Sequence, residues 1–380
     1  MSTGIKVAAH YFIAVVFGAI YAVLKLVTRV DPCKITFLSR HSDGITRDFR
    51  MLIQELERRD PNIVIATVSS RFEGNPRAAL RFGLASLRSL YHLATTKVCV
   101  LDSYWPAVSS LRHRPELVVF QAWHSLGKIK QSGRQTLDRE QGRSQKLAQS
   151  MRIHEGYDWV VAGGKAWNPF YCASFGVDES KLLNIGLPRA DYLVNHRQQI
   201  ARRVLKSHPE LAQKPTILYA PTFRRGSGPD TGARDLAAAI DRDRFNLIVH
   251  GHKDGNLIMP DGEYVTCPGF TGPELLTVAE YLVTDYSAIA VEAALIDVKT
   301  LYYVHDHDEY LATNGLNIDL FEEMPGCVSE SAEEIARVID GEYPMDALRA
   351  YQAKFIFDSP GRSTENLVDC FFEKGGLCTR

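Results

Sequence analysis

Short runs of β-branched residues alternate with stretches of helical periodicity from Lys34 onward, and this alternation restricts the possible folds more than any other feature of the sequence. Lys34–Ser39 predicts a strand, and Phe49, Leu52, Ile53 and Leu56 then recur at helical spacing. Strands that alternate with amphipathic helices are typical of βαβ units, in which helices cover a parallel sheet. The sequence therefore predicts the α/β class.

The same alternation restarts in the second half of the chain and predicts two doubly wound sheet domains. A chain of 380 residues also exceeds the usual size of a single hydrophobic core. We expect strands at Lys34–Ser39, Asn62–Val68, Lys97–Leu101, Leu117–Gln121, Tyr157–Ala162 and Leu182–Gly186, then at Thr216–Ala220, Leu247–His250, Tyr264–Cys267, Tyr281–Thr284 and Thr300–Val304. The predicted domains are residues 31–190 and 191–345, followed by a helical tail at 346–380.

Helices are predicted between these strands from the same periodicity. The expected helical segments are Arg77–Leu93, Arg134–His154, Ala190–Lys206 and Ile335–Ile339. Ser331 and Glu334 have the spacing of a capping box for the last of these segments.

The N-terminal segment Val7–Leu24 is apolar, with eighteen residues and no formal charge. As a helix it would measure about 27 Å, slightly less than a typical hydrocarbon core. Lys25 and Arg29 follow it, which argues against a secretory cleavage site and, for a spanning helix, predicts a cytoplasmic catalytic body. We therefore predict a membrane-associating helix at residues 1–30. It is either a single anchor or a helix on the membrane surface, and both alternatives are open.

The overall composition excludes several function classes. A net charge of −1 argues against a globally basic nucleic-acid binder. The seven cysteines are scattered and form no Cys-x-x-Cys pair, which argues against a disulfide framework or structural zinc and favours a reducing cytosol. The motifs of P-loop nucleotidases, nicotinamide enzymes, serine hydrolases and zincins are absent from the sequence.

Four polar clusters follow predicted strands, where parallel sheets bind their ligands. The first begins at Trp123-His124 and continues to Lys128 and Lys130. A histidine at a strand end can accept a proton from an attacking hydroxyl at neutral pH, and the lysines add positive charge beside it. A core histidine bonded to the backbone is the alternative.

The second cluster is Pro221-Thr-Phe-Arg-Arg-Gly226, and the third contains His250 and His252. Threonine and arginine side chains after a strand suit an anion such as phosphate. We interpret His252 as a phosphate donor, because no further ligand at suitable spacing completes a metal site. Solvated surface turns are the alternative for both clusters.

The fourth cluster is Thr284-Asp-Tyr-Ser287, between a strand and the helix predicted after it. Ser287 is a natural N-cap, so the free N–H groups of the first turn could bind a diphosphate. The alternative is that Ser287 only caps the helix and Asp285 only turns the chain.

These four clusters, in this order, resemble those of the CDP-glycerol glycerophosphotransferase family of teichoic-acid and capsule synthesis. Asn184-Ile-Gly-Leu-Pro-Arg189 and Gly315–Gly326 are also similar to that family, and the resemblance extends over most of the chain from Lys34. It implies two facing Rossmann-like domains in the GT-B arrangement, with cytidine diphosphate held mainly by the second. It also implies an enzyme at the cytoplasmic face of the cell membrane.

The resemblance further implies that His124 deprotonates an acceptor hydroxyl, which attacks the phosphorus bonded to the polyol and expels CMP. The donor would be CDP-glycerol or CDP-ribitol, with glycerol phosphate as the expected group, and the acceptor an undecaprenyl-linked saccharide; no cofactor is assigned and a metal requirement is open. The residues implied for the donor are Thr222, Arg224, His252, Thr284, Asp285, Ser287 and Glu292, and those for the acceptor or phosphate are Trp123, Lys128 and Arg189.

Two departures from the family pattern affect these expectations. Ser125-Leu-Gly127 stands where many relatives have Gly-Thr-Pro, which puts the choice of acceptor in doubt, and Ala288 replaces a frequent second serine. The chain lacks the additional region of the long polymerases, so a primase that adds one or a few units is expected. A nucleotide-sugar glycosyltransferase of the same architecture and an inactive membrane-bound scaffold are the competing interpretations.

Overall fold

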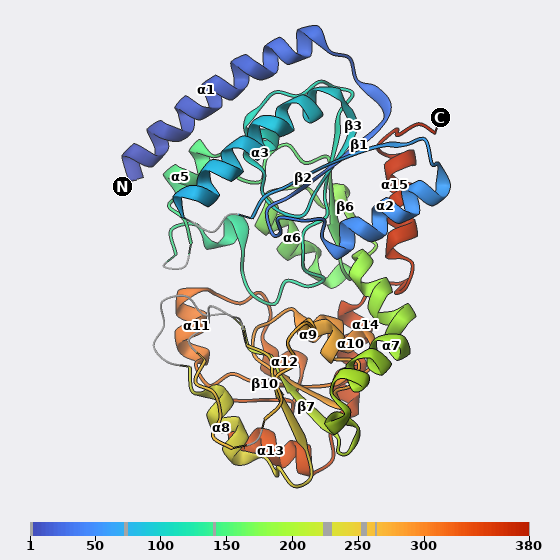
Figure 1. Cartoon of the computed structure of the whole chain (residues 1–380). Helices are drawn as coiled ribbons and strands as arrows, with labels where there is room; N and C mark the ends of the chain where they lie inside the picture. The colour runs from blue at the N-terminus through green and yellow to red at the C-terminus, as the bar shows by residue number, and fades with distance from the viewer. Residues whose placement is uncertain are drawn as a thin grey trace.

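The computed structural model describes residues 3–71, 75–139, 142–222, 230–251, 257–262 and 264–379. Its named strands pair in parallel and form one sheet of six strands and one of five. Figure 1 shows the first sheet in the upper half of the molecule and the second in the lower half. The predicted α/β class is confirmed.

The six-stranded sheet has the order β2-β1-β3-β4-β5-β6. Its strands are β1 (Asp31–Ser39), β2 (Val64–Ser69), β3 (Thr96–Leu101), β4 (Val118–Gln121), β5 (Trp159–Ala162) and β6 (Leu182–Asn184). The chain moves outward from β1 to β2 and then crosses back to β3. The loops after β1 and β3 therefore lead away in opposite directions, which creates a crevice at their carboxyl ends.

Helices cover this sheet because their apolar faces match its buried strands. They are α2 (Arg47–Arg59), α3 (Pro76–Thr95), α4 (Pro106–Ser110), α5 (Gln145–Ser150) and α6 (Asn168–Phe175), and α7 (Pro188–Ser207) leads to the second sheet. In α2, the Thr46 hydroxyl accepts the Phe49 N–H and caps the first turn. Phe49, Leu52 and Leu56 are buried as their spacing predicts.

The five-stranded sheet has the order β11-β10-β9-β7-β8. Its strands are β7 (Thr216–Tyr219), β8 (Asn246–Val249), β9 (Tyr281–Thr284), β10 (Lys299–Tyr303) and β11 (Val328–Ser329), and its helices include α8 (Gly232–Ala239), α9 (Gly272–Leu275), α10 (Ile289–Leu295), α11 (His307–Thr313), α12 (Leu320–Glu323) and α13 (Ala332–Asp340). The strand order here reverses between β7 and β9. A second crevice is therefore expected where the loops after these two strands separate.

The last two helices, α14 (Met345–Phe355) and α15 (Ser363–Glu373), return to the first half of the molecule. Figure 1 shows α15 beside α2. The indole N–H of Trp167 donates to the carbonyl of Phe355 at 3.1 Å, and the N–H of Cys378 donates to the carbonyl of Pro32 at 2.9 Å. The helical tail thus connects the two sheets.

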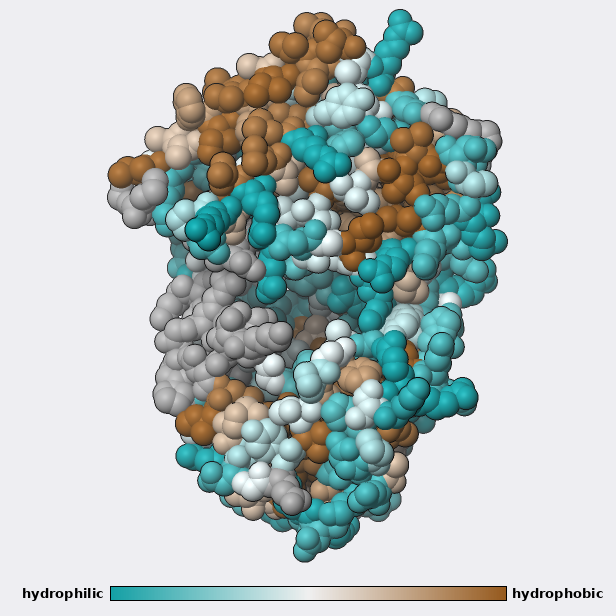
Figure 2. All heavy atoms as spheres, in the orientation of Figure 1, coloured by the Kyte–Doolittle hydropathy of each residue, from teal (hydrophilic) through white to brown (hydrophobic). Residues whose placement is uncertain are grey.

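The N-terminal helix α1 (Thr3–Val27) lies along α3 (Figure 1). Tyr21 fixes it there, since its ring is buried and its hydroxyl donates to the carbonyl of Leu93 at 3.2 Å. Most other apolar side chains of α1 are exposed, and Figure 2 shows them as a hydrophobic area across the top of the molecule. Within the described residues, α1 is the one helix long and apolar enough to cross a membrane.

Two predicted elements differ from the structure, and one strand of the structure was not predicted. Arg134–His154 is not one helix, because its described residues form a short 3₁₀ turn at Gly133–Thr136 and the six-residue α5. Tyr264–Cys267 is not a strand, since only Val265 makes a bridge, to Ile248. The two-residue β11 is too short for a periodic signal, and the sequence did not predict it.

Candidate active site

The chain turns sharply after β4, and this turn presents His124. Trp123 has a left-handed backbone conformation, with φ of 62°, which is unusual for a bulky residue. Its N–H donates a hydrogen bond of 2.9 Å to Oε1 of Gln121, which stabilises the turn. The rings of Trp123 and His124 lie against each other, with centroids 4.0 Å apart. The turn therefore fixes the position of the imidazole.

His124 is held through one ring nitrogen. Its Nδ1 lies 3.2 Å from the backbone oxygen of Asp102, after β3, and 3.1 Å from Nε2 of His41, after β1. Its Nε2 has no hydrogen-bond partner in the described part of the chain. A histidine that donates from Nδ1 to a carbonyl carries its lone pair on Nε2 and can accept a proton there. Burial, together with the nearby His41 and Arg189, lowers the pKa of His124 well below its usual value.

Lys128 lies behind Trp123 and is almost fully buried, with 3% of its surface exposed. Its ammonium donates to Oγ of Ser132 at 2.9 Å and lies 4.6 Å from the ring centroid of Trp123 and 4.5 Å from that of Phe175. Burial lowers the pKa of Lys128 to about 7. In this position Lys128 supports Trp123 by a cation–π contact, and its contact with acceptor or phosphate stays a prediction.

Arg189 follows β6 and is held by Asp48 of α2. The Asp48 carboxylate accepts the backbone N–H of Arg189 at 2.8 Å, its Nε–H at 2.9 Å and a further bond from Nη2. Nη1 of Arg189 donates to the carbonyl of His124 at 3.0 Å. Arg189 was predicted to bind the acceptor or a phosphate, and the structure adds that it positions the His124 backbone.

Thr284 and Asp285 stabilise the loop that follows β7. The Thr284 hydroxyl donates to the carbonyl of Ala220 at 2.7 Å, and the Asp285 carboxylate accepts the N–H of Thr222 at 2.8 and 3.0 Å. Thr284 and Asp285 are both buried. These two predicted donor residues therefore shape the loop that carries Thr222.

The prediction that Ser287 caps the following helix is wrong. Helix α10 begins at Ile289, and the residue before it, Ala288, makes no side-chain capping bond. The ring of Tyr286 is buried and stacked on that of Tyr310, with centroids 4.0 Å apart. After this anchor the chain makes a tighter turn, in which the carbonyl of Ser287 accepts the N–H of Ala290 at 3.3 Å, before the helix starts.

Glu292 is a buried carboxylate of α10, with 4% of its surface exposed. Within the described residues its Oε2 makes no hydrogen bond. Burial raises the pKa of Glu292 to about 7, although the positive charge of Arg189 opposes this shift. The electrostatic effect of Arg189 shows that a predicted donor residue of the second half lies near the His124 cluster of the first.

Further contacts bring the loop after His124 against the second half of the chain. A Cβ added to Gly127 would lie 2.6 Å from Cγ2 of Val291, so only glycine allows this approach of the loop to α10. The Asn317 side-chain amide donates to the carbonyl of Lys128 at 2.7 Å, and Gln131 N–H donates to the carbonyl of Gly315 at 2.9 Å.

Two predicted donor residues, Arg224 and His252, lie outside the described residues. In the described part of the chain, no group of three or more His, Cys, Asp or Glu side chains could hold a metal ion.

Sequence reasoning missed His41, Asp102 and Asp48, all of which surround His124 or Arg189. His41 and Asp102 follow β1 and β3, the two strands between which the sheet order reverses. Their positions immediately after apolar strands were a usable signal. No such signal marked Asp48. It lies in the first turn of a helix, where an acidic residue is ordinarily expected on the surface, because it interacts favourably with the helix dipole.

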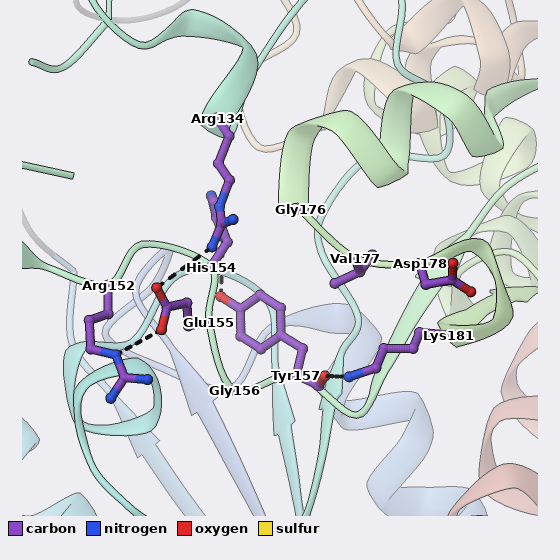
Figure 3. Close-up of a pocket in the computed structure, with 10 residues that line it drawn as sticks. All are labelled: Arg134, Arg152, His154, Glu155, Gly156, Tyr157, Gly176, Val177, Asp178 and Lys181. Carbon is purple, nitrogen blue, oxygen red and sulfur yellow. Dashed lines mark hydrogen bonds and ion pairs between the residues drawn. The ribbon is translucent and has the colours of Figure 1, made fainter. Parts of the chain in front are cut away.

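A separate pocket of about 300 Å³ lies at α6 and the segment before β5 (Figure 3). Figure 3 shows Arg134 and Arg152 converging on Glu155, with N–O distances of 3.9 and 2.7 Å. Lys181 donates to the backbone oxygen of Tyr157 at 2.9 Å. The basic side chains are thus already paired, and His124 does not line this pocket.

The two parallel sheets, with a histidine at the crevice of the first, form an α/β fold similar to that of the wall teichoic acid polymerase TagF. A solved TagF structure aligns with a TM-score of 0.74 at 16% identity, over 98% of this chain and 97% of that one. The chain belongs to the CDP-glycerol:poly(glycerophosphate) glycerophosphotransferase family, whose model matches residues 20–373. This confirms the resemblance, and the chain is a CDP-glycerol glycerophosphotransferase-like enzyme of teichoic acid biosynthesis.

Two curated relatives resemble the chain over most of its length. The teichoic acid ribitol-phosphate primase of Bacillus spizizenii is 26% identical over 93% of this chain and 94% of its own length. The teichoic acid glycerol-phosphate primase of Bacillus subtilis is 23% identical over 74% of this chain and 75% of its own.

Proposed function

We propose that the chain transfers a polyol phosphate from a CDP-polyol to a hydroxyl of a lipid-linked cell-wall or capsule acceptor, with release of CMP. Glycerol phosphate is the group we expect, and ribitol phosphate is the alternative, since similar primases carry both names. The match to full-length primases supports the addition of one or a few units. The acceptor class we propose is an undecaprenyl-linked saccharide.

The observation that carries this proposal is the fixed orientation of His124. Nδ1 of His124 faces the carbonyl of Asp102 at 3.2 Å, so Nε2 is left with a lone pair. The lowered pKa of His124 keeps the ring neutral at physiological pH. A neutral imidazole with a free Nε2 is suited to act as a general base.

In the proposed step, Nε2 of His124 takes the proton of the acceptor hydroxyl. The hydroxyl oxygen forms a bond to the phosphorus that carries the polyol, and the bond from that phosphorus to the CMP oxygen breaks. The electron pair leaves with CMP. Phosphoryl transfer depends mainly on the positioning of its groups and the stabilisation of charge, which side chains and backbone N–H groups can supply.

We assign the donor to the crevice between β7 and β9 and the acceptor to the crevice between β1 and β3, in two facing domains of GT-B type. The donor residues we propose are Thr222, Arg224, His252, Thr284, Asp285, Ser287 and Glu292. Thr284 and Asp285 would act by holding the loop of Thr222, as their hydrogen bonds suggest. The hydroxyl of Ser287 caps no helix and is available for the diphosphate.

We further propose that the enzyme works at the cytoplasmic face of the cell membrane, attached by α1 and α3. Leu80, Leu84 and Leu87 of α3 are exposed in a helical stripe, as are most apolar residues of α1. Arg77, Arg81 and Arg88 belong to the same helix α3. Exposed leucines next to basic residues are typical of helices that lie in an anionic membrane surface. Between the two alternatives for the N-terminal segment, this favours a surface helix.

The deciding experiment is an assay of CMP release by the detergent-solubilised chain. CDP-glycerol, CDP-ribitol and UDP-sugars are each supplied with a lipid-linked disaccharide, and His124→Ala is assayed in parallel with a binding measurement for the donor. We expect CMP from one CDP-polyol and its loss in His124→Ala, with donor affinity unchanged. Turnover with UDP-sugars alone would favour a glycosyltransferase, and turnover of His124→Ala near the wild-type rate would remove His124 as the base.

A further inference from the structure

Two histidines from different strands meet at the first crevice. Nε2 of His41 lies 3.1 Å from Nδ1 of His124, and the two ring centroids are 4.3 Å apart at an interplanar angle of 61°. This edge-on geometry directs a nitrogen of one ring at a nitrogen of the other, so one proton lies between them. The contact therefore couples the tautomers of the two rings.

We propose that His41 is a positioning residue, which holds His124 in the tautomer with a free Nε2 and passes the accepted proton on to solvent. The inference rests on the proposed function of His124 as the base. When Nε2 of His41 carries the lone pair, it accepts the Nδ1–H of His124 together with the carbonyl of Asp102. In the reverse arrangement Nε2 of His41 carries the proton and donates it to Nδ1 of His124. The single ring proton of His124 then lies on Nε2, which blocks the base.

The proton path balances without any further reagent. Nε2 of His124 gains the proton of the acceptor hydroxyl, Nδ1 of His124 gives its proton to Nε2 of His41, and Nδ1 of His41 releases a proton to water. Each ring ends neutral, with its two nitrogens exchanged in role. His41 keeps a larger fraction of its surface open to solvent than His124, although the surrounding protein partly desolvates its ring, so His41 is the ring with access to solvent. The pair resets when Nε2 of His124 gives its proton to water, Nε2 of His41 returns a proton to Nδ1 of His124, and Nδ1 of His41 takes a proton from water.

The charges around the pair favour a single shared proton. Asp102 is the carboxylate that acts on His41, and Arg40, Arg71 and Arg189 are the cations. Burial and these cations lower the pKa of His41, and Arg189 and Lys128 act on His124 in the same direction. Two imidazolium rings at this separation would repel each other, so protonation of one disfavours protonation of the other.

The test uses the full-length chain in detergent and the CMP-release assay with the active CDP-polyol. His41→Ala removes the partner of Nδ1, and His41→Gln restores an oxygen acceptor but carries no exchangeable proton. His196→Ala, at an exposed histidine of α7, is the matched control. For each variant kcat, the donor dissociation constant and the pH dependence of kcat/KM are measured.

We expect His41→Ala to lower kcat by about ten- to hundredfold, since a general base contributes at least about a hundredfold and its orientation only part of that. Donor affinity should be unchanged. His41→Gln should recover part of the lost rate. The acid limb of its pH profile for kcat/KM should move toward the ordinary histidine pKa, because His41 no longer lowers the pKa of His124. His196→Ala should behave as the wild type.

The inference is overturned if His41→Ala keeps kcat within twofold of the wild type, or if its loss of rate is explained entirely by weaker donor binding. Its failure differs from failure of the proposed function. If the wild type releases CMP and His124→Ala does not, the proposed function stands. The His41 variants then test only the role of His41. No release from any CDP-polyol removes both.

Discussion

Asp48 and Arg189 form a three-bond clamp, in which one carboxylate accepts the backbone N–H, the Nε–H and an Nη2–H of the same arginine. The clamp joins α2 to the start of α7. Because Nη1 of the same arginine donates to the carbonyl of His124, the clamp also supports the turn that carries the base. Stability and catalysis should therefore respond together when it is broken.

Asp48→Asn tests this clamp. The Asp48 side chain is 7% exposed and that of Arg189 is 29% exposed, so we expect a loss of about 2 kcal/mol of unfolding free energy, below the value for a fully buried pair. The rate kcat should fall as well, because the His124 carbonyl loses a fixed donor. Denaturant unfolding and CMP release are the measurements. Asp340→Asn, in an exposed pair with Arg244, is the control and should cost less than about 1 kcal/mol. An equally small cost for Asp48→Asn would contradict the clamp.

Lys128→Met should alter stability in a pH-dependent way. The pKa of Lys128 is about 7 in the folded chain and 10.5 without this environment. Between about pH 7 and pH 10.5 the unfolded chain therefore binds more protons than the folded chain. Wild-type stability should therefore rise from about pH 7 to pH 10, and the variant should lack this rise. Thermal unfolding at pH 7 and pH 9.5 measures it. A parallel pH dependence of wild type and variant would show that the ammonium is not destabilised by burial.

Glu292→Gln should act in the opposite sense. Burial raises the folded pKa of Glu292 to about 7, so the folded chain keeps a proton that the unfolded chain loses above about pH 4.5. The contribution of this carboxyl group to the free energy of unfolding of the wild type therefore decreases between about pH 4.5 and pH 7, and it is constant above pH 7. The variant should thus gain stability over the wild type as the pH rises to 7, with no gain at pH 4. Unfolding curves across this range test the prediction, and a gain independent of pH would refute it.

The sequence predicted the elements whose signals are local. Apolar runs located ten of the eleven strands found in the described part of the chain, and the spacing of Phe49, Leu52 and Leu56 located the buried face of α2. The family motifs selected His124, whose free Nε2 is consistent with the role assigned to it. These features follow from the sequence because each depends on a few neighbouring residues.

Features that depend on tertiary contacts could not be predicted in this way. The position of Lys128 is set by the ring of Trp123 and by two rings of α6, those of Tyr171 and Phe175, and its burial among them could not be predicted from its own charge. Ser287 has the chemistry of an N-cap, but the stacking of Tyr286 on Tyr310 fixes the chain before it, and the helix starts one residue later, after Ala288. The pairing of His41 with His124 joins residues 83 positions apart, and only the order of the strands brings them together.

The attachment of the enzyme to membranes provides the last prediction. If α1 lies on the surface beside α3, the exposed leucines of α3 insert as well. Leu80→Gln with Leu84→Gln should then weaken binding by about tenfold or more, since each buried leucine contributes up to about 2 kcal/mol. Flotation with vesicles of anionic phospholipid measures this, and high salt should weaken binding further through the arginines of α3. Leu311→Gln, an exposed leucine on α11, is the control. Binding that ignores both the α3 substitutions and salt would instead indicate that α1 alone inserts as an anchor.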